Sequence, residues 1–377
     1  MKKILFISTR NPYSNRYSGD VIGSKKIINI LKKNCELDVM TLGYKEDFSQ
    51  NNVFIFKSPI LISKLINVIK SLFLLKPLQF GLFYSNKMQN FINDRASDYD
   101  LIFFYHIRSS QYLPKNYYGK KIIEMGDLYS NNYEQTFYNL NFLNPLKYVY
   151  FLESLLIKNI EKKIFVDFDK IILFSKNEIK KLKGSFKDKI IHINISIDKI
   201  KKKYLFSKKN KKILFIGNLK YLPNILAIKI FVKKILPRLK KNLPDVELEI
   251  IGDISNLDKF FLSFVKNVKC WGPQKNIDKF IKGSFCGLAN LQIATGMQGK
   301  VLSYMSFGLP VICSKKAANN FGKSVMSYSN DDDFIFKINK LKNDKKLSSQ
   351  ISKKSLTFVK KFTWTKIQKE YLKLIKN

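Results

Sequence analysis

Short apolar runs alternate with amphipathic segments along the whole chain. Residues 3–8 are apolar enough for a buried strand, residues 9–19 are polar like a loop, and residues 20–33 repeat apolar side chains at helical spacing. A second strand-like run follows at residues 37–42. This strand-helix-strand order is typical of a parallel β-sheet.

The strand-like runs form two groups on either side of a lysine-rich segment, residues 199–212, which suits a solvated linker. Before it, the pattern predicts further strands at residues 53–56, 101–105, 121–124, 170–174 and 189–193. After it, strands are predicted at residues 213–216, 247–251, 268–271, 285–289 and 310–313. Helices are predicted near residues 223–241, 257–266, 277–282, 297–307, 331–340, 345–360 and 362–375.

This alternation predicts an α/β protein with two tandem Rossmann-like, doubly wound domains that face each other across a cleft. We expect the first domain at residues 1–205 and the second at residues 206–360, with a final helix over residues 361–377 packing back on the first domain. Ligands of such sheets bind beyond the carboxyl ends of the strands.

Composition narrows the class of protein. A chain of 377 residues with 45% hydrophobic residues can form packed cores, which excludes global disorder. Four cysteines without CxxC spacing favour a reducing compartment over a disulfide framework. No apolar run reaches the roughly 18 residues of a membrane span, and residues 1–7 are followed by no signal-peptide pattern. We therefore expect a soluble or peripheral protein.

The formal net charge of +39 has two explanations that the sequence leaves open. It indicates either polyanionic partners, such as membranes, phosphorylated substrates or nucleic acid, or a coding bias toward lysine. Only five of the 68 basic residues are arginines, and the lysines are spread over nearly every segment. Because no nucleic-acid-binding motif is present either, we expect no nucleic-acid partner.

One segment, residues 295–312, combines features of an anion site. Gly296 would let the backbone approach a ligand closely, and Lys300 would follow one turn into a helix whose first amides are unpaired. Gly308 would end that helix and Pro310 would start the next strand. A diphosphate would suit this site, although an ordinary strand-loop-helix unit is the alternative.

Residues 296–312 resemble the donor-binding segment of the group 1, family 4 glycosyltransferases, which have the GT-B fold. Residues 212–219, followed by Tyr221-Leu222-Pro223-Asn224, resemble the opening of that family's second domain. The resemblance implies that no metal and no cofactor besides a nucleotide diphosphate sugar is needed. It implies a donor site that contains Gly19, Gly217, Asn218, Gly296, Met297, Gln298, Lys300 and Ser303.

The chain departs from the family pattern at the positions that would bind the ribose of the donor. Two glutamates of the family fall on Thr295 and Ser303, and residues 279–330 contain no acidic residue. Ribose recognition would then come from Ser303, from Gln298 or from the backbone. An acid-free region still favours a diphosphate electrostatically.

Candidate chemistry in the first domain follows the predicted strands. Gly19 lies in Ser18-Gly19-Asp20, which is either a phosphate-binding loop or a tight turn. His106 follows residues 101–105 and matches a sugar-contacting histidine of the family, although packing is the alternative. Glu124 and Asp127 follow residues 121–124; either they orient an acceptor hydroxyl or they cap the next helix. With Lys300, we take His106 and Asp127 as the candidate catalytic residues.

Two further segments have alternative interpretations. Asp331-Asp332-Asp333 precedes a helical run, which favours capping over metal binding. Residues 58–83 predict a helix with an apolar face flanked by Lys64, Lys70 and Lys76. That helix would lie on an anionic membrane surface or pack in the core.

The sequence thus predicts a metal-independent, retaining hexosyltransferase-type glycosyltransferase of bacterial surface polysaccharide synthesis. Its partners would be a nucleotide sugar, a glycan or lipid-linked acceptor and an anionic membrane surface. It would be cytoplasmic and peripheral on the inner face of the cytoplasmic membrane. The alternative is an inactive GT-B relative that binds a nucleotide sugar or a partner, because the ribose glutamate is missing.

Overall fold

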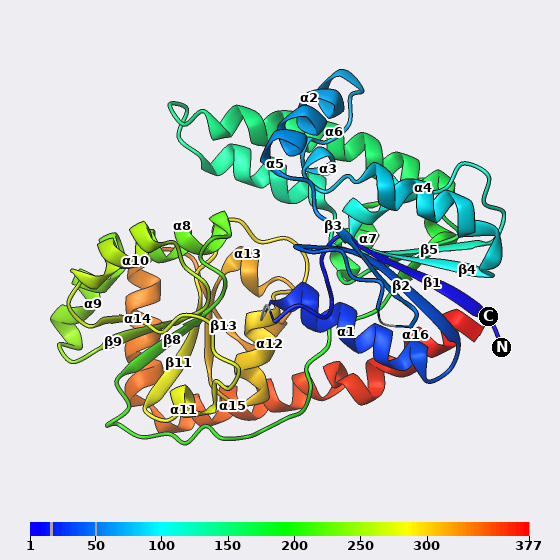
Figure 1. The fold of residues 1–377 in the computed structure, drawn as a ribbon. Helices are drawn as coiled ribbons and strands as arrows, with labels where there is room; N and C mark the ends of the chain where they lie inside the picture. The colour runs from blue at the N-terminus through cyan, green and yellow to red at the C-terminus, as the bar shows by residue number, and fades with distance from the viewer. Residues whose placement is uncertain (16–17, 50, 377) are drawn as a thin grey trace. The chain divides into compact units, whose positions relative to one another are not determined.

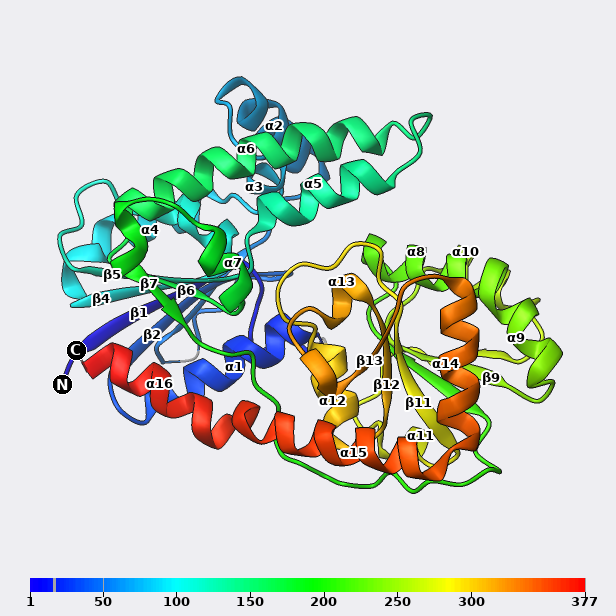
Figure 2. The same cartoon turned by 180° about the vertical axis from the view of Figure 1, so that it is seen from behind.

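The computed structural model describes residues 1–15, 18–49 and 51–376. The chain divides into two compact units, one made of Met1–Asn194 with Gln368–Asn377 and the other of Ile195–Ile367. Each unit is built around a parallel β-sheet (Figures 1 and 2). The α/β class and the two doubly wound sheets predicted from the sequence are confirmed.

The sheet of the first unit has the strand order β3-β2-β1-β4-β5-β6-β7, with every neighbouring pair parallel. Its strands are β1 (Lys3–Ser8), β2 (Glu36–Gly43), β3 (Val53–Lys57), β4 (Leu101–Tyr105), β5 (Lys120–Gly126), β6 (Lys170–Leu173) and β7 (Ile190–His192). Its helices are α1 (Gly19–Lys32), α2 (Leu61–Phe73), α3 (Leu78–Leu82), α4 (Asn86–Arg95), α5 (Tyr129–Asn139), α6 (Leu146–Asp167) and α7 (Lys176–Lys181).

The sheet of the second unit has the order β10-β9-β8-β11-β12-β13 and is also parallel. Its strands are β8 (Lys212–Ile216), β9 (Glu247–Ile251), β10 (Val268–Cys270), β11 (Ser284–Ala289), β12 (Val311–Ser314) and β13 (Met326–Tyr328). Its helices are α8 (Leu222–Ile230), α9 (Leu236–Asn242), α10 (Asn256–Ser263), α11 (Asp278–Ile281), α12 (Gly299–Ser306), α13 (Lys315–Ala318), α14 (Asp331–Asn343) and α15 (Lys345–Val359). The last helix, α16 (Trp364–Lys376), contributes residues to both units.

Apolar side chains on successive residues of β8 pack into two different cores, as expected for a strand covered on both faces. Leu214 packs with Val301 and Leu302 of α12. Its neighbour Phe215 packs with Ile228 of α8 and other residues on the opposite side of the sheet. The sheet therefore sits between two helical layers, which leaves the loops at the strand ends free for ligands.

In both sheets the strand order reverses beside the first strand, between β1 and β4 and between β8 and β11. Such a reversal separates the loops that follow the two strands and opens a crevice at their carboxyl ends. The predicted Gly217 directly follows β8 and lies in the loop at this position, whereas the predicted Gly19 is the first residue of α1, the helix that follows β1.

Most predicted elements are found within a few residues of their expected ends, but one expected helix is wrong and one strand was missed. Residues 58–83 do not form one helix, because Leu75 takes a positive φ of 52° and Pro77 disfavours helix before it, so the segment breaks into α2 and α3. Strand β13 was not predicted, since a three-residue edge strand, Met326–Tyr328, gives almost no periodic signal.

The expectation that domains end at residues 205 and 360 stays a prediction, because the two compact units of the structure do not show which segments fold independently. No helix in the described part of the chain has the length and apolar character of a membrane span. The loop expected at residues 9–19 includes residues 16 and 17, which lie outside the described residues.

Candidate functional site

The strongest candidate site in the second unit is centred on Lys300, in the first turn of α12. Its ammonium Nζ donates a hydrogen bond of 2.6 Å to Oδ1 of Asn224 on α8. The same Nζ lies 4.0 Å from the centre of the Phe215 ring, at the end of β8. Burial lowers the pKa of Lys300 to about 7, because a buried cation loses its hydration. A bound anion would restore the charged form.

Glycines bring the backbone close to this amine. A Cβ at Gly217 would lie 3.1 Å from Lys300 Nζ and 2.9 Å from Asn224 Nδ2, so a side chain there would displace both groups. Gly252 has a φ of 146°, and a Cβ there would lie 1.9 Å from the carbonyl oxygen of Gly217. Asn224 Nδ2 also donates to the carbonyl oxygen of Asn218 at 2.8 Å. The loop after β8 is thereby fixed against α8.

The loop before α12 is held by side chains that bind its carbonyl groups. Gln298 Nε2 donates to the Thr295 oxygen at 2.7 Å, and Asn320 Nδ2 donates to the Gly296 oxygen at 2.5 Å. Gly296 has a φ of 59°, which glycine adopts without strain. The N-cap residue Gln298 gives α12 no side-chain cap, so its side chain leaves the first helical amides available to a ligand.

Ser303 lies one turn further along α12, and its hydroxyl donates to the Gly299 carbonyl oxygen at 3.1 Å. Its oxygen can still accept a hydrogen bond. Met297 is partly buried against the core of the second unit and belongs to the same loop. The predicted Gly217, Asn218 and Lys300 meet around Asn224, which belongs to the motif Tyr221-Leu222-Pro223-Asn224 but was not predicted as a site residue.

The first unit gathers polar side chains at the carboxyl ends of three adjacent strands, β1, β4 and β5. Arg10 follows β1 and forms an ion pair with Asp20, next to the predicted Gly19 in the first turn of α1. Burial alone would raise the pKa of Asp20, but the charge of Arg10 and the hydrogen bonds from Ser18 and Arg10 together outweigh burial, and the pKa falls to about 2. Ser18 precedes α1 without capping it through its side chain. The start of α1 thus combines a fixed ion pair with uncapped amides.

His106 directly follows β4, as predicted, and takes an unusual backbone conformation with a φ of 66°. Its Nδ1 lies 3.4 Å from the Tyr129 hydroxyl. Burial and the charge of Arg108 lower the pKa of His106 to about 4. The ring is therefore neutral at neutral pH and can donate from one nitrogen and accept at the other.

Arg108 is an unexpected member of this group. Its guanidinium lies over the Phe83 ring at 4.7 Å, and its Nε is buried without a hydrogen-bond partner in the described residues. No carboxylate within the described ranges forms an ion pair with it, and burial lowers its pKa. Buried cations are usually paired, so Arg108 is suited to an anionic ligand group. One arginine in a short helical segment gives no sequence signal for this role.

Asp127 follows β5 and has a buried Oδ1 with no partner in the part of the chain that the structure describes. The buried Glu178, at the start of α7, likewise has an unpartnered Oε1. Burial raises the pKa of both carboxyls, and the charge of Asp127 raises that of Glu178 further. The pair can therefore hold a proton near neutral pH.

Helix capping, the alternative role for Asp127 and Glu124, is wrong. The N-cap of α5 is Leu128, and Glu161 instead binds the amide and hydroxyl of Ser130 in its first turn. Glu124 is buried and accepts a hydrogen bond from the Tyr371 hydroxyl of α16. Burial raises the pKa of Glu124 to about 7. Glu124 therefore joins β5 to α16 within the first unit.

No group of three or more potential metal-ligating side chains occurs in the described residues. In the aspartate run, Asn330 caps α14 by accepting from the Asp333 amide. Asp332 pairs with Arg238, and Asp333 pairs with Lys337. The N-cap is thus Asn330 rather than one of the aspartates, which form the acidic first turn of α14 and interact favourably with the helix dipole.

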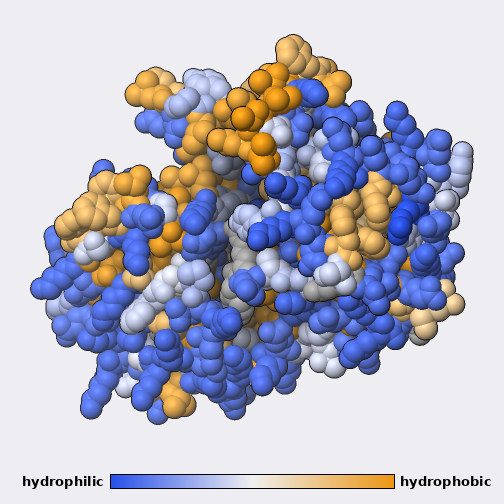
Figure 3. Space-filling model, in the orientation of Figure 1, coloured by the Kyte–Doolittle hydropathy of each residue, from blue (hydrophilic) through white to orange (hydrophobic). Residues whose placement is uncertain are grey.

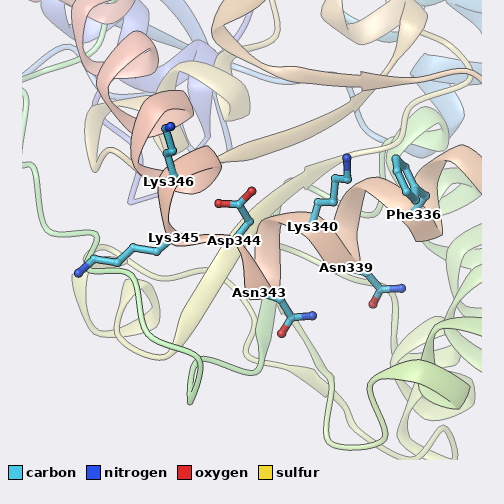
Figure 4. A pocket seen from close by; sticks show the side chains of 7 residues that line it. All are labelled: Phe336, Asn339, Lys340, Asn343, Asp344, Lys345 and Lys346. Atoms are coloured by element: carbon cyan, nitrogen blue, oxygen red, sulfur yellow. The ribbon is translucent and has the colours of Figure 1, made fainter.

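A wide surface depression at the corner between α14 and α15 is lined by Phe336, Asn339, Lys340, Asn343, Asp344, Lys345 and Lys346. Its side chains point in different directions rather than toward one centre (Figure 4). None of the candidate site residues lines it, so we assign it no role.

Comparison with known proteins identifies the fold. Residues 210–344 match the family model for group 1 glycosyl transferases. No curated protein sequence matches the chain significantly. The chain is similar to the structure of HepE from Anabaena in complex with UDP and glucose, with 13% identity, a TM-score of 0.67 and full coverage of both chains (100% of each).

Two other solved structures have the same architecture. TarM from S. aureus is 11% identical with a TM-score of 0.66, covering 100% of this chain and 99% of TarM. The trehalose-6-phosphate synthase OtsA has the same identity of 11%, a TM-score of 0.66 and the same coverage, 100% and 99%. Identities this low establish the fold, and the family model identifies the segment that contains Lys300. The chain therefore has the GT-B fold, and its residues 210–344 are similar to group 1 glycosyl transferases.

Proposed function

We propose that the protein transfers a sugar from a nucleotide diphosphate sugar to a glycan or lipid-linked acceptor. The observation that supports this most is the arrangement of Lys300, Asn224 and Gly217. A half-buried amine, uncapped helix amides and a close glycine backbone together provide donors without any acidic residue from 279 to 330. Such a set suits a diphosphate. The similar HepE structures contain UDP and UDP-glucose.

In this proposal the second unit stabilises the leaving group. When the sugar-phosphate bond breaks, negative charge develops on the diphosphate. Lys300 and the first amides of α12 are fixed in place before the reaction, so they can stabilise that charge without reorganising. Because Asn224 is neutral, it orients the ammonium without cancelling its charge.

Recognition of the ribose has to differ from the family pattern. Ser303 and Thr295 stand where the family has glutamates. We propose that the Ser303 oxygen or the Gln298 carboxamide receives a ribose hydroxyl, with backbone groups of the same loop. A serine contact is weaker than a charge-assisted one, so we expect modest donor affinity.

In this proposal the first unit binds the acceptor. The neutral His106 can hydrogen-bond a sugar hydroxyl, and Asp127 with Glu178 can hold or accept a proton. Following the resemblance to the GT-B family, we propose retention of the anomeric configuration and no metal requirement. We further propose a role in bacterial surface polysaccharide synthesis, at the cytoplasmic face of the membrane.

One observation favours a second candidate function, a catalytically inactive relative that binds a nucleotide sugar or a partner. The two glutamate positions of the family are Thr295 and Ser303 here. Such a protein would bind UDP or GDP yet leave every donor intact.

Incubating the protein with a panel of nucleotide sugars and a bacterial lipid extract separates the two. We expect one donor to release its nucleotide diphosphate, with loss of release in Lys300→Met. Exposed Lys323 gives the matched control Lys323→Met, which should keep full activity. If the folded protein released no nucleotide diphosphate from any donor, the transferase proposal would be rejected in favour of the inactive relative.

A further inference from the structure

An unusually large apolar surface lies on the first unit, outside the candidate site. Most outward side chains of α2 and of the turn after it are exposed, including Leu61 at 82%, Phe73 at 83% and Leu75 at 72%. Ile60, Ile62, Leu65, Ile66, Ile69, Leu72 and Leu74 are exposed as well. Figure 3 shows this surface as a continuous orange region over α2. The core-packing alternative for this helix is therefore wrong, since its apolar face is mostly uncovered.

A second apolar surface covers the turn between α5 and α6. Phe142 and Leu143 are 68% and 76% exposed. The flanking helix residues Tyr138, Leu146, Tyr148, Val149 and Phe151 are exposed too. This part of the surface was not predicted from the sequence, because its apolar side chains lie in and around a turn.

Buried contacts join α2, α3 and α6 into one support for these side chains. Glu153 of α6 accepts hydrogen bonds from the amides of Leu78 and Gln79, at 3.1 and 2.9 Å, at the start of α3. A Cβ at Gly81 of α3 would lie 2.5 Å from the Asn67 backbone of α2, so the two helices touch there. The α2 face is thus fixed to the helix pair that presents the second surface. We call the two together the apolar face.

Basic residues dominate the charge around the apolar face, although one of them, Lys87, forms an ion pair with Glu46. Residues 48–93 contain no Asp or Glu, and neither do residues 135–152. These stretches contain Lys57, Lys64, Lys70, Lys76, Lys87 and Lys147. A face that exposes Leu, Ile and Phe among lysines is complementary to anionic lipid, where acyl chains receive the apolar groups and headgroups receive the ammonium groups.

A small pocket lies at the base of α2. Its volume is about 260 Å³, and its lining includes Lys57, Ser63, Asn67, Tyr84 and Ser85, with Ile66 on the apolar side. A cation, hydroxyls and amide groups beside an apolar wall match a lipid headgroup with its first acyl carbons.

We propose that the apolar face inserts into the interface of an anionic lipid bilayer, with the pocket beside Lys57 receiving a headgroup phosphate. This goes beyond the catalytic proposal, because it names the surface and the lipid class rather than the reaction. A second copy of the chain is a poorer occupant, since a symmetric contact would bring the same lysines together without any acidic partner from these stretches.

Vesicle flotation tests the proposal. We expect binding to phosphatidylcholine vesicles with about a third phosphatidylglycerol, and about tenfold weaker binding to pure phosphatidylcholine or in high salt. The double variant Leu61→Glu/Phe73→Glu should reduce the bound fraction about tenfold, and Phe142→Glu/Leu143→Glu should do the same. All four side chains are exposed, so these changes should not unfold the protein.

The matched control is Leu205→Glu/Phe336→Glu, which changes exposed side chains of the same types in the second unit. It should bind vesicles like the wild type. Equal binding by all variants, or no binding to anionic vesicles, would overturn the proposal. A dimer in solution that Leu61→Glu/Phe73→Glu converts to monomer would assign the face to a second copy instead. A UDP-induced thermal shift, measured on every variant, reports on the donor site separately, so the two proposals can fail independently.

Discussion

The ammonium of Lys300 is held by the carboxamide oxygen of Asn224, at 2.6 Å, rather than by a carboxylate. A carboxylate would neutralise the lysine and repel a diphosphate, whereas an amide fixes its position and leaves the charge available. With the Phe215 ring beneath it, the half-buried amine is poorly solvated. UDP binding should therefore depend both on the neutrality of Asn224 and on the protonation of Lys300.

Replacing Asn224 by aspartate should weaken donor binding. Asn224→Asp would raise the pKa of Lys300, pair its charge internally and lower UDP affinity about tenfold or more. Isothermal titration calorimetry with UDP measures this. The control Asn343→Asp adds the same charge at an exposed position of the same unit and should leave the affinity unchanged. Equal affinities for the two variants would contradict the role of Asn224.

Donor binding should also depend on pH through Lys300. Without ligand the pKa of Lys300 is about 7, below its ordinary value of 10.5, and a bound diphosphate should raise it. Binding then takes up a proton above pH 7, so UDP affinity falls as pH rises, by up to about tenfold per pH unit. Calorimetry in buffers of different ionisation enthalpy measures the uptake, which Lys300→Met should abolish. Uptake that persists in this variant would assign the proton to another group.

The free protein should show the opposite trend in stability from this residue. Unfolded Lys300 binds more protons than folded Lys300 between about pH 7 and its ordinary pKa of 10.5, so its contribution to the free energy of unfolding rises with pH in that window. Lys300→Met should flatten the rise measured by urea denaturation.

Arg108 should matter more to the acceptor than to stability. Because the buried guanidinium has no carboxylate partner in the described residues, Arg108→Met should leave the melting temperature unchanged or higher. Turnover with an anionic acceptor should fall while UDP affinity stays constant. Arg238→Met, which breaks an ion pair with Asp332, should leave turnover unchanged. Unchanged turnover in Arg108→Met would refute the acceptor role.

Removing the Tyr371 hydroxyl should destabilise the first unit. Tyr371→Phe leaves the buried Glu124 carboxyl without its donor, which costs about 1 to 3 kcal/mol. The pKa of folded Glu124 is about 7 against an ordinary 4.5, so its contribution is present below pH 4.5 and is lost as pH rises through 7. In the variant the pKa rises further, and the loss of stability should extend above pH 7.

Urea denaturation at acidic and alkaline pH checks this prediction. Tyr118→Phe is the control, because the Tyr118 side chain is 95% exposed. If both variants had the same free energy of unfolding at every pH, the hydrogen bond between Tyr371 and Glu124 would not contribute to stability.

Alanine substitutions at two glycines with positive φ, Gly252 and Gly272, distinguish the effect of backbone strain from the effect of a close contact. Gly252→Ala would place a Cβ 1.9 Å from the Gly217 oxygen, whereas Gly272→Ala meets no atom within 4 Å. Both changes strain the backbone by about 1 kcal/mol, but only Gly252→Ala should also displace the Gly217 loop and abolish the UDP-induced thermal shift. Thermal unfolding with and without UDP measures both effects, and a normal shift in Gly252→Ala would contradict the close contact.

The local pattern of apolar and polar residues was sufficient to predict the buried strands and the loop before α12. Buried strands such as β1 and β4 are mostly apolar runs, and each has the bounds that were expected. The anion loop was visible because glycine, helix start and lysine are neighbours in sequence. The break before Pro77 was missed because the apolar periodicity continues across it.

The partners of the site residues could not be read from local pattern. Lys300 and Asn224 are 76 residues apart, and Asp127 and Glu178 come from different strand-loop units. Which side chains meet at strand ends depends on sheet order and register, and no periodicity encodes these. The role of the lone Arg108 could not be predicted for the same reason, since it depends on the lack of an ion pair between Arg108 and any described carboxylate.

The most direct test of the account is UDP binding by the wild type, Lys300→Met and the control Lys323→Met, measured by calorimetry at about pH 7. We expect UDP binding by the wild type and the control, and a loss of affinity of about a hundredfold in Lys300→Met, because one desolvated charge contact with a phosphate is removed. Equal UDP affinity in all three folded proteins, or no binding in any, would contradict the assignment of Lys300 to a diphosphate site.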